Sequence, residues 1–351
     1  MAARASKARR AFTGDATTAR AMQAGKAAWW AASGLAARRL VRIDRGEGRP
    51  DVRSEAPPVS MAELRRAWLE AFAKDTADVE AGLYPYAEAP ANPQRMFARL
   101  TDLFEDARAV DARRRRRAGT EARAEASSTA YPAYYRQNFH YQSGGWFTEA
   151  SAQRYEAQVE LLFSGAAGPM RRRALSLLAR AWRDRDQRGL RVLDVACGSG
   201  AFLADLRASF PRALSLGLDL SRPYLKEARR RSGAAVVQAN AERLPFADAS
   251  LDAATCVYLF HELPPRVRPV VARELARVLK PGGVLAFADS AQAADAPGLK
   301  RLLDAFPALF HEPFFASYQE EDLPALFAEA GLRLEGHDSA FLTKALLLRK
   351  A

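Results

Sequence analysis

The 351-residue chain has few cysteines and no long apolar run. Cys197 and Cys256 are its only cysteines, which excludes a disulfide framework and fits a reducing compartment such as the cytoplasm. No uninterrupted apolar stretch reaches the ~18 residues of a membrane-spanning helix. No apolar block is followed by a cleavage-like site, so we expect no secretory signal peptide. Hydrophobic residues still make up 49% of the chain, enough for one full domain and a sizeable addition.

Acidic residues are scarce in the first half of the chain. Residues 186–351 hold 21 Lys or Arg and 20 Asp or Glu, so nearly all of the net charge of +12 lies before them. Within the first half, residues 1–43 contain nine basic residues and a single acid, Asp15. We predict three parts: a basic N-terminal segment with a linker (1–58), a mainly helical N-terminal region (59–185) and a C-terminal domain (186–351).

The basic segment 1–43 also has the apolar pattern of an amphipathic helix, with Trp29 and Trp30 adjacent. Three interpretations remain open. The helix packs on the rest of the protein and leaves a basic face in solvent. Alternatively, it lies on an anionic lipid surface as a peripheral membrane contact, because basic residues and paired Trp suit that boundary. Finally, an Arg-rich, acid-poor segment is typical of an organelle transit peptide, which would change the location from the cytoplasm to an organelle.

Two features of the helical region bear on fold and partners. The pattern Ser60 to Glu63 is that of a capping box and predicts a helix start. The five arginines Arg113–Arg117 suit either nucleic-acid binding or a solvated helix face or loop. Nucleic-acid binders usually combine charge with aromatic stacking platforms, and none accompany this block. We therefore expect no nucleic-acid partner.

Aromatic residues are concentrated in residues 131–147, where seven of 17 positions are Phe, Tyr or Trp against 9% of the chain. Such density is typical of core packing. It equally suits a lid whose rings cover an apolar ligand, with Asn138, His140 and Gln142 supplying hydrogen bonds. The pair Gly144-Gly145 provides a turn or hinge. Both interpretations remain open.

From Leu190 onward the sequence alternates between predicted strands and helices. The strands are predicted at residues 192–195, 214–219, 235–238, 253–257, 283–288 and 341–348. Alternation of this kind is typical of a parallel sheet covered by helices on both faces. Ligands of such sheets bind at the carboxyl ends of the strands.

Small and acidic residues stand at these strand ends. Asp194 lies near the end of the first strand, and the loop Cys197–Gly200 follows, where glycines let the backbone bend sharply and approach a ligand closely. Asp219 closes the next strand, at a distance from the loop that suits the two hydroxyls of a ribose. Leu203 stands where a dinucleotide-binding loop needs its third glycine, and the loop has no lysine. A dehydrogenase and a P-loop are therefore disfavoured.

Five motifs in this half resemble, in order and spacing, those of class I S-adenosylmethionine-dependent methyltransferases. They are Leu193–Gly200, Gly217–Ser221, Ala239–Phe246, Ser250–Asp252 and Leu279–Gly283. The likeness is to the methyltransferase type 11 group, which includes ubiquinone and menaquinone C-methyltransferases. It implies an α/β fold, namely a Rossmann-like, doubly wound, mostly parallel seven-stranded sheet with a mainly helical N-terminal addition. Ala196 replaces the family's first loop glycine, and Asn240 replaces an aspartate that many members carry.

The resemblance also implies S-adenosyl-L-methionine as the cofactor and assigns its binding to residues at the strand ends. These are Asp194, Ala196, Cys197, Gly198, Gly200, Asp219, Leu220, Asn240, Ala241, Glu242 and Tyr258. No metal site is expected.

His261 is the first candidate for a catalytic base, because it follows the fourth strand, where the methyl group should emerge. Its unperturbed pKa of ~6.5 would suit proton transfer near neutrality. The alternative is a histidine that fixes the loop. His140 and Tyr258 are the next candidates, and the aromatic segment 311–315 is expected to form a wall for an apolar acceptor.

The function expected from these features is methyl transfer to an apolar or aromatic small molecule, which the sequence does not identify. RNA or protein methylation is an alternative supported only by the basic charge, and salt-dependent RNA binding would distinguish it. A non-catalytic protein that binds adenosylmethionine is a third possibility, because fold alone does not establish function.

Overall fold

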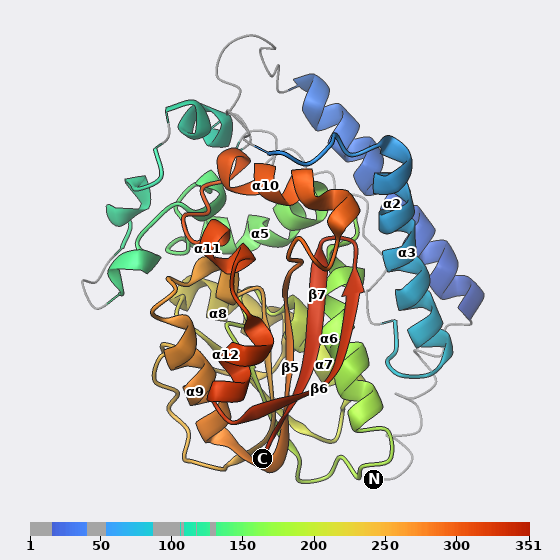
Figure 1. Cartoon of the computed structure of the whole chain (residues 1–351), viewed down its shortest axis with the longest axis vertical. Helices are drawn as coiled ribbons and strands as arrows, with labels where there is room; N and C mark the ends of the chain where they lie inside the picture. Colours follow the sequence, from blue (N-terminus) through green and yellow to red (C-terminus); the bar gives the residue numbers. More distant parts are fainter. Residues whose placement is uncertain (1–15, 41–53, 87–105, 107–108, 117, 127–130) are drawn as a thin grey trace.

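The computed structural model describes residues 16–40, 54–86, 106, 109–116, 118–126 and 131–351. The start of the basic segment, most of the predicted linker before residue 58, and Arg117 lie outside these residues. A central seven-stranded sheet organises the rest (Figure 1).

The sheet has the strand order β3-β2-β1-β4-β5-β7-β6. Its strands are β1 (Arg191–Val195), β2 (Leu214–Asp219), β3 (Ala235–Gln238), β4 (Leu251–Val257), β5 (Leu279–Ser290), β6 (Leu332–Ala340) and β7 (Thr343–Lys350). β7 runs antiparallel to its neighbours β5 and β6, and the other pairs are parallel. The predicted doubly wound, mostly parallel sheet is confirmed. The chain order reverses between β1 and β4, which places a ligand site at their carboxyl ends.

β6 is the strand that the sequence pattern did not reveal. It lies at the edge of the sheet, and most of its residues face solvent, including the charged Arg333 and Glu335. An edge strand of this kind needs no alternating apolar pattern, because only its ends reach the core.

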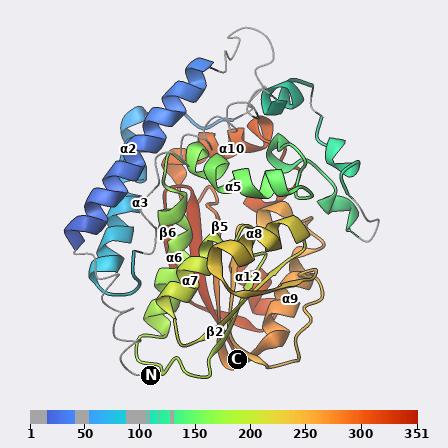
Figure 2. The same cartoon turned by 180° about the vertical axis from the view of Figure 1, so that it is seen from behind.

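Helices cover both faces of the sheet, as the alternation predicted (Figures 1 and 2). One face carries α6 (Ala167–Ala181), α7 (Ala201–Ser209) and α8 (Arg222–Ser232), and the other carries α9 (Arg268–Val278) and α12 (Leu323–Glu329). Each face has its own apolar core, built around Leu178 and Leu203 on one side and Leu275 and Phe327 on the other. The helix α6 belongs to the region predicted as an N-terminal addition, yet it packs directly on β5, β6 and β7.

The carboxyl ends of the strands lie beneath α5 (Glu149–Leu162), α10 (Lys300–Leu309) and α11 (Phe315–Gln319) (Figure 1). The aromatic segment joins this cover as two 3-10 turns, Ala133–Tyr135 and Phe139–Tyr141. The N-terminal region, together with α10 and α11 from the chain between β5 and β6, therefore covers the end of the sheet where a ligand is expected.

The remaining helices α2 (Ala16–Leu40) and α3 (Met61–Glu80) pack beside the sheet on α5 and α6. α3 begins at the predicted capping box, in which Ser60 Oγ accepts a hydrogen bond from the Glu63 backbone N–H at 3.1 Å. It is fixed to α6 by Asp75, whose two carboxylate oxygens lie 2.7 Å from two nitrogens of Arg172. Such a buried, bidentate ion pair locks the two helices in one arrangement.

Trp29 and Trp30 of α2 pack against Ala157 of α5. The described helix of the basic segment thus packs on the rest of the protein, as the first of the three interpretations of this segment expected. The lipid and transit-peptide interpretations stay untested. Separately, none of the helices in the described ranges has the length and apolar character that a membrane crossing needs.

The four described arginines of the predicted basic block are paired with acids close by in sequence, Arg116 with Glu121 at 3.8 Å. Arg114 and Arg115 lie 2.5 Å and 2.9 Å from the two oxygens of Asp111, and Arg113 lies 2.8 Å from Glu121. These ion pairs favour the interpretation of the block as a solvated helix face over its interpretation as a nucleic-acid-binding surface, which would contact phosphates.

Candidate active site

Asp194 sits at the end of β1 with only 1% of its surface exposed. Its Oδ1 accepts a hydrogen bond from Thr255 Oγ1 at 2.7 Å, whereas Oδ2 has no partner among the described residues. Burial raises the pKa of Asp194 to about 7, although the Thr255 hydrogen bond opposes the rise. Asp194 Oδ2 is thus a buried acceptor without a cationic partner among the described residues.

The loop between β1 and α7 depends on left-handed backbone conformations. Gly200 has φ 78°, and a Cβ there would lie 2.6 Å from Ala228 Cα, so only glycine fits against α8. Ala196 also has positive φ, at 58°. The replacement of the family's glycine by alanine is therefore accommodated at a conformational cost of roughly 1–2 kcal/mol.

Asp219 at the end of β2 holds this loop in place. Its Oδ2 accepts a hydrogen bond from the Gly198 backbone N–H at 2.9 Å, and its Oδ1 accepts one from the Ser221 N–H at 2.7 Å. Burial raises its pKa, and these backbone hydrogen bonds counteract that rise. A carboxylate fixed in this way can still accept hydrogen bonds from a diol, because each oxygen has a second lone pair.

One cavity joins these strand ends. Its wall includes all of the predicted cofactor-binding residues except Gly200 and Glu242. Gly200 instead caps α7, and Glu242 accepts hydrogen bonds from Asn240 Nδ2 at 3.0 Å and from the Tyr134 hydroxyl at 2.7 Å. The last contact ties the aromatic segment to the loop after β3.

The aromatic segment serves as both core and cover. Phe139 and Trp146 are 1% and 8% exposed and cluster with Tyr224 of α8. Trp146 nevertheless lines the cavity, together with Tyr134 and Tyr135. The two sequence interpretations of this segment are therefore compatible, because some of its rings pack against α5 and α8 and others line the cavity.

Arg171 is a cavity residue that the sequence interpretation missed. It comes from α6, and its Nη2 lies 2.9 Å from Glu156 Oε2, whose other oxygen accepts a hydrogen bond from Ser199 Oγ at 2.7 Å. Although burial opposes ionisation, Arg171 keeps the pKa of Glu156 below its ordinary value. The Arg171 Nε has no hydrogen-bond partner in the described part of the chain. The sequence signal for it is the run of three arginines, Arg171–Arg173, within a helix that is largely apolar elsewhere.

His261 lies beside this cavity without forming part of its wall. Its side chain is 8% exposed, and its Nδ1 lies 2.5 Å from Oδ1 of the fully buried Asp289. Burial alone would lower the pKa of His261, but the Asp289 carboxylate raises it to about 9. The premise of an ordinary pKa near neutrality is thus wrong. The role of His261 as a base stays a prediction.

Tyr258 does line the cavity, but its hydroxyl lies 2.5 Å from Thr343 Oγ1 on β7. Burial raises the pKa of this hydroxyl, although the Thr343 hydrogen bond opposes the rise. Tyr258 therefore suits wall formation better than proton abstraction.

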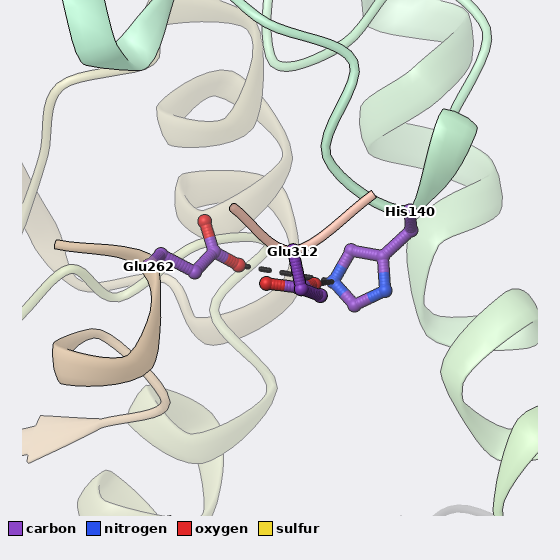
Figure 3. A group of neighbouring side chains, drawn as sticks. All are labelled: His140, Glu262 and Glu312. Carbon is purple, nitrogen blue, oxygen red and sulfur yellow. Dashed lines mark ion pairs between the residues drawn. The ribbon is translucent and has the colours of Figure 1, made fainter. Parts of the chain in front are cut away.

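The Nε2 edge of the His140 ring faces two carboxylates that come from other parts of the fold (Figure 3). Its Nε2 is 2.9 Å from Glu312 Oε1 and 3.8 Å from Glu262 Oε1. Burial alone would lower the pKa of His140, but Glu312 and Glu262 raise it to about 10. Glu262 lines the cofactor-side cavity, so this cluster borders it.

A second, more apolar cavity lies on the other side of the cluster. Its wall includes His140, Val159, Leu162 and Phe310, and it shares Tyr155 with the first cavity. Of the segment predicted as an acceptor wall, Glu312 joins the His140 cluster and Phe315 packs near His261, with ring centres 6.1 Å apart. The apolar wall comes instead from α5 and the end of α10.

Comparison with known proteins agrees with this geometry. Residues 192–283 match the family model described as a methyltransferase domain. The chain is 39% identical over 125 residues to a fatty-acid O-methyltransferase of Mycolicibacterium smegmatis, a match that covers 35% of this chain and 45% of the relative. It is 35% identical over 147 residues to a demethylmenaquinone methyltransferase of Listeria welshimeri. That match covers 39% of this chain and 61% of the relative.

Among solved structures, a magnesium protoporphyrin IX methyltransferase from Synechocystis with bound SAH matches with a TM-score of 0.40. The identity is 18%, and the match covers 53% of this chain and 84% of that one. The sequence matches span less than two thirds of the relatives' own length. By its motifs and sheet, the C-terminal half of the chain is a class I S-adenosylmethionine-dependent methyltransferase domain.

Proposed function

We propose that the protein transfers the methyl group of S-adenosylmethionine to an apolar or aromatic small molecule. The observation that carries this proposal is the set of complementary groups around the first cavity. Asp194 Oδ2 and Arg171 Nε are buried and lack hydrogen-bond partners among the described residues, and both belong to residues of the cavity wall. An acceptor and a cationic donor in one cavity suit the ammonium and carboxylate of an amino acid.

The chain would hold the cofactor in three places. Asp194 and Arg171 suit its methionine part, Asp219 suits the ribose hydroxyls, and the loop at Asn240 suits adenine. The bound cofactor supplies an electrophilic methyl group on a sulfonium, which needs little further activation. The task left to the protein is to align the acceptor with that group and to exclude water.

The second cavity supports an apolar acceptor. Val159, Leu162 and Phe310 contribute to its wall, and Tyr155 links it to the cofactor cavity. A fatty acid and demethylmenaquinone, which appear in the names of two relatives, are both largely apolar. We therefore place the acceptor's apolar part in this cavity and its reacting atom near Tyr155.

The proposal is tested with the full-length protein and S-adenosylmethionine labelled in its methyl group. Calorimetry should show saturable binding. Extracts of cells that lack the protein should contain an unmethylated acceptor, to which the purified protein transfers the label. Binding without transfer to any extract component would instead favour a non-catalytic role, and salt-dependent transfer to RNA would favour the nucleic-acid alternative.

We expect cofactor binding to strengthen with pH through Asp194. In the free protein the pKa of this carboxyl is about 7, and the cofactor's positive charge favours its ionised form. Binding should therefore release a proton, and affinity should rise about fivefold between pH 6 and pH 7, while the cofactor's amino group stays protonated. Calorimetry in two buffers of different ionisation enthalpy measures the proton release. Asp194→Asn should abolish this pH dependence, and an affinity that falls with pH would contradict the assignment.

The cover should also contribute to cofactor affinity through Tyr134. Replacement Tyr134→Phe removes the 2.7 Å hydrogen bond to Glu242 and loosens the link between the aromatic segment and the loop after β3. We expect S-adenosylmethionine to bind about three- to tenfold more weakly, corresponding to ~1 kcal/mol. Tyr131→Phe is the matched control, because its hydroxyl makes only a 3.4 Å contact with Gln238. Equal affinities of the two variants would show that the cover is not coupled to the site.

A further inference from the structure

Three segments distant in sequence bring their side chains together at the border of the two cavities. His140 belongs to the aromatic segment, Glu262 follows β4, and Glu312 lies between α10 and α11. One potential ligand atom from each lies within 4.8 Å of the others. Figure 3 shows both carboxylates directed at the same edge of the His140 ring. This convergence is not a local consequence of one helix or loop.

The cluster around the buried Glu312 holds more carboxylates than cationic side chains. Its side chain is 0% exposed, and no described residue donates a well-aligned hydrogen bond to either oxygen, although His140 Nε2 lies 2.9 Å from Oε1. No Lys or Arg in the described ranges forms an ion pair with Glu262 or Glu312. His261 Nε2 lies 3.9 Å from Glu262, but its Nδ1 is already engaged by Asp289. Three carboxylates thus share two histidines, and a buried carboxylate without aligned donors is costly. A divalent cation among the three side chains would remove the imbalance.

We infer that His140, Glu262 and Glu312 bind a divalent first-row metal ion. One imidazole nitrogen and two carboxylates suit Zn²⁺, Mn²⁺ or Fe²⁺, whereas Mg²⁺ prefers oxygen ligands and retains several waters. The distances of 2.9 Å and 3.8 Å from His140 Nε2 to the two carboxylates are close to the spacing of neighbouring ligands around such an ion, roughly 3–3.5 Å. A bound ion would draw the three ligand atoms, which lie within 4.8 Å of one another, to this spacing.

The position of the site suggests what the ion would do. Glu262 lines the cofactor-side cavity and His140 the apolar one, so the ion would lie at their junction. There it would bind an oxygen atom of the acceptor and fix the acceptor beside the cofactor. This role, unlike the metal site itself, rests on the proposed methyltransferase function.

The test uses the full-length protein after treatment with a chelator. Calorimetric titration with ZnCl₂, and electron paramagnetic resonance with MnCl₂, should show one bound ion per chain. Glu312→Gln keeps the shape of the side chain and removes a buried charge, so the variant should fold, as a circular dichroism melting curve will show. It should bind Zn²⁺ about 100-fold more weakly, and so should His140→Gln. His337→Gln is the matched control, because this histidine is exposed on β6, and it should bind like the unaltered protein.

Absence of saturable Zn²⁺ and Mn²⁺ binding would overturn the inference and leave a histidine held between two carboxylates. Unchanged affinity in a folded Glu312→Gln variant would overturn it too. S-Adenosylmethionine binding is measured on the same samples, so that a failure of the metal site can be distinguished from a failure of the proposed function. A protein that binds the cofactor but no metal contradicts only the metal site, and one that binds metal but no cofactor contradicts only the function.

Discussion

Replacement Asp219→Ala is expected to weaken S-adenosylmethionine binding by about 30- to 1,000-fold, equivalent to roughly 2–4 kcal/mol. The Asp219 carboxylate has two roles. It would accept charge-assisted hydrogen bonds from the ribose, and it already accepts the backbone N–H groups of Gly198 and Ser221. Alanine therefore removes a ligand contact and also frees the loop that shapes the cavity. Isothermal calorimetry on the full-length protein measures the effect.

Asp252→Ala is the matched control for this prediction. Asp252 is also buried on the central sheet, but it lies at the opposite end of β4, where it accepts hydrogen bonds from the Arg191 N–H and from Lys280. Its loss should lower thermal stability and leave cofactor affinity nearly unchanged. Equal weakening by both variants would mean that Asp219 acts through stability alone. Tight NAD binding with none for S-adenosylmethionine would contradict the methyltransferase assignment altogether.

The cofactor side of the site was predictable because it is local in sequence. Asp194, the glycine loop and Asp219 belong to successive strand ends, and a parallel sheet necessarily brings such ends to one edge. Asn240 and Tyr258, which the family resemblance assigned to the cofactor, also follow strand ends and lie in the cavity wall. Each of these positions follows from strand order and the direction of the chain.

The other residues around the two cavities were not predictable in this way, because they come from segments far apart in the sequence. Arg171 reaches the cavity only because α6 packs on the sheet beside α7. His140 and Glu312 meet because the aromatic segment folds over the strand ends. There the backbone N–H of His140 also donates a hydrogen bond to the backbone carbonyl of His311. A pattern of residue types does not reveal such tertiary contacts, nor the neighbouring Asp289 carboxylate that raises the pKa of His261.

His261→Ala is expected to lower the stability of the protein much more than its turnover. Asp289 is fully buried, and its Oδ1 lies 2.5 Å from His261 Nδ1. Among the described residues, the carboxylate without the ring would keep the N–H groups of Phe260 and Ser290, each at 2.7 Å. Loss of one partner from a buried ion pair costs roughly 3–5 kcal/mol. Thermal unfolding followed by circular dichroism should show a melting temperature lower by roughly 5–15 °C.

The double variant His261→Ala/Asp289→Asn separates this structural role from general-base catalysis. A neutral amide at position 289 needs no cation, so the double variant should regain part of the lost stability. If His261 only supports the loop, turnover measured well below the melting temperature should fall less than about tenfold in both variants, because the residues of the cavity wall are retained. If His261 instead removes a proton, turnover should fall by ~10²–10⁴-fold in both variants, including the double variant whose stability has recovered. A large loss of turnover in that stable protein would therefore assign the base to His261, since neither unfolding nor a displaced loop could then account for it.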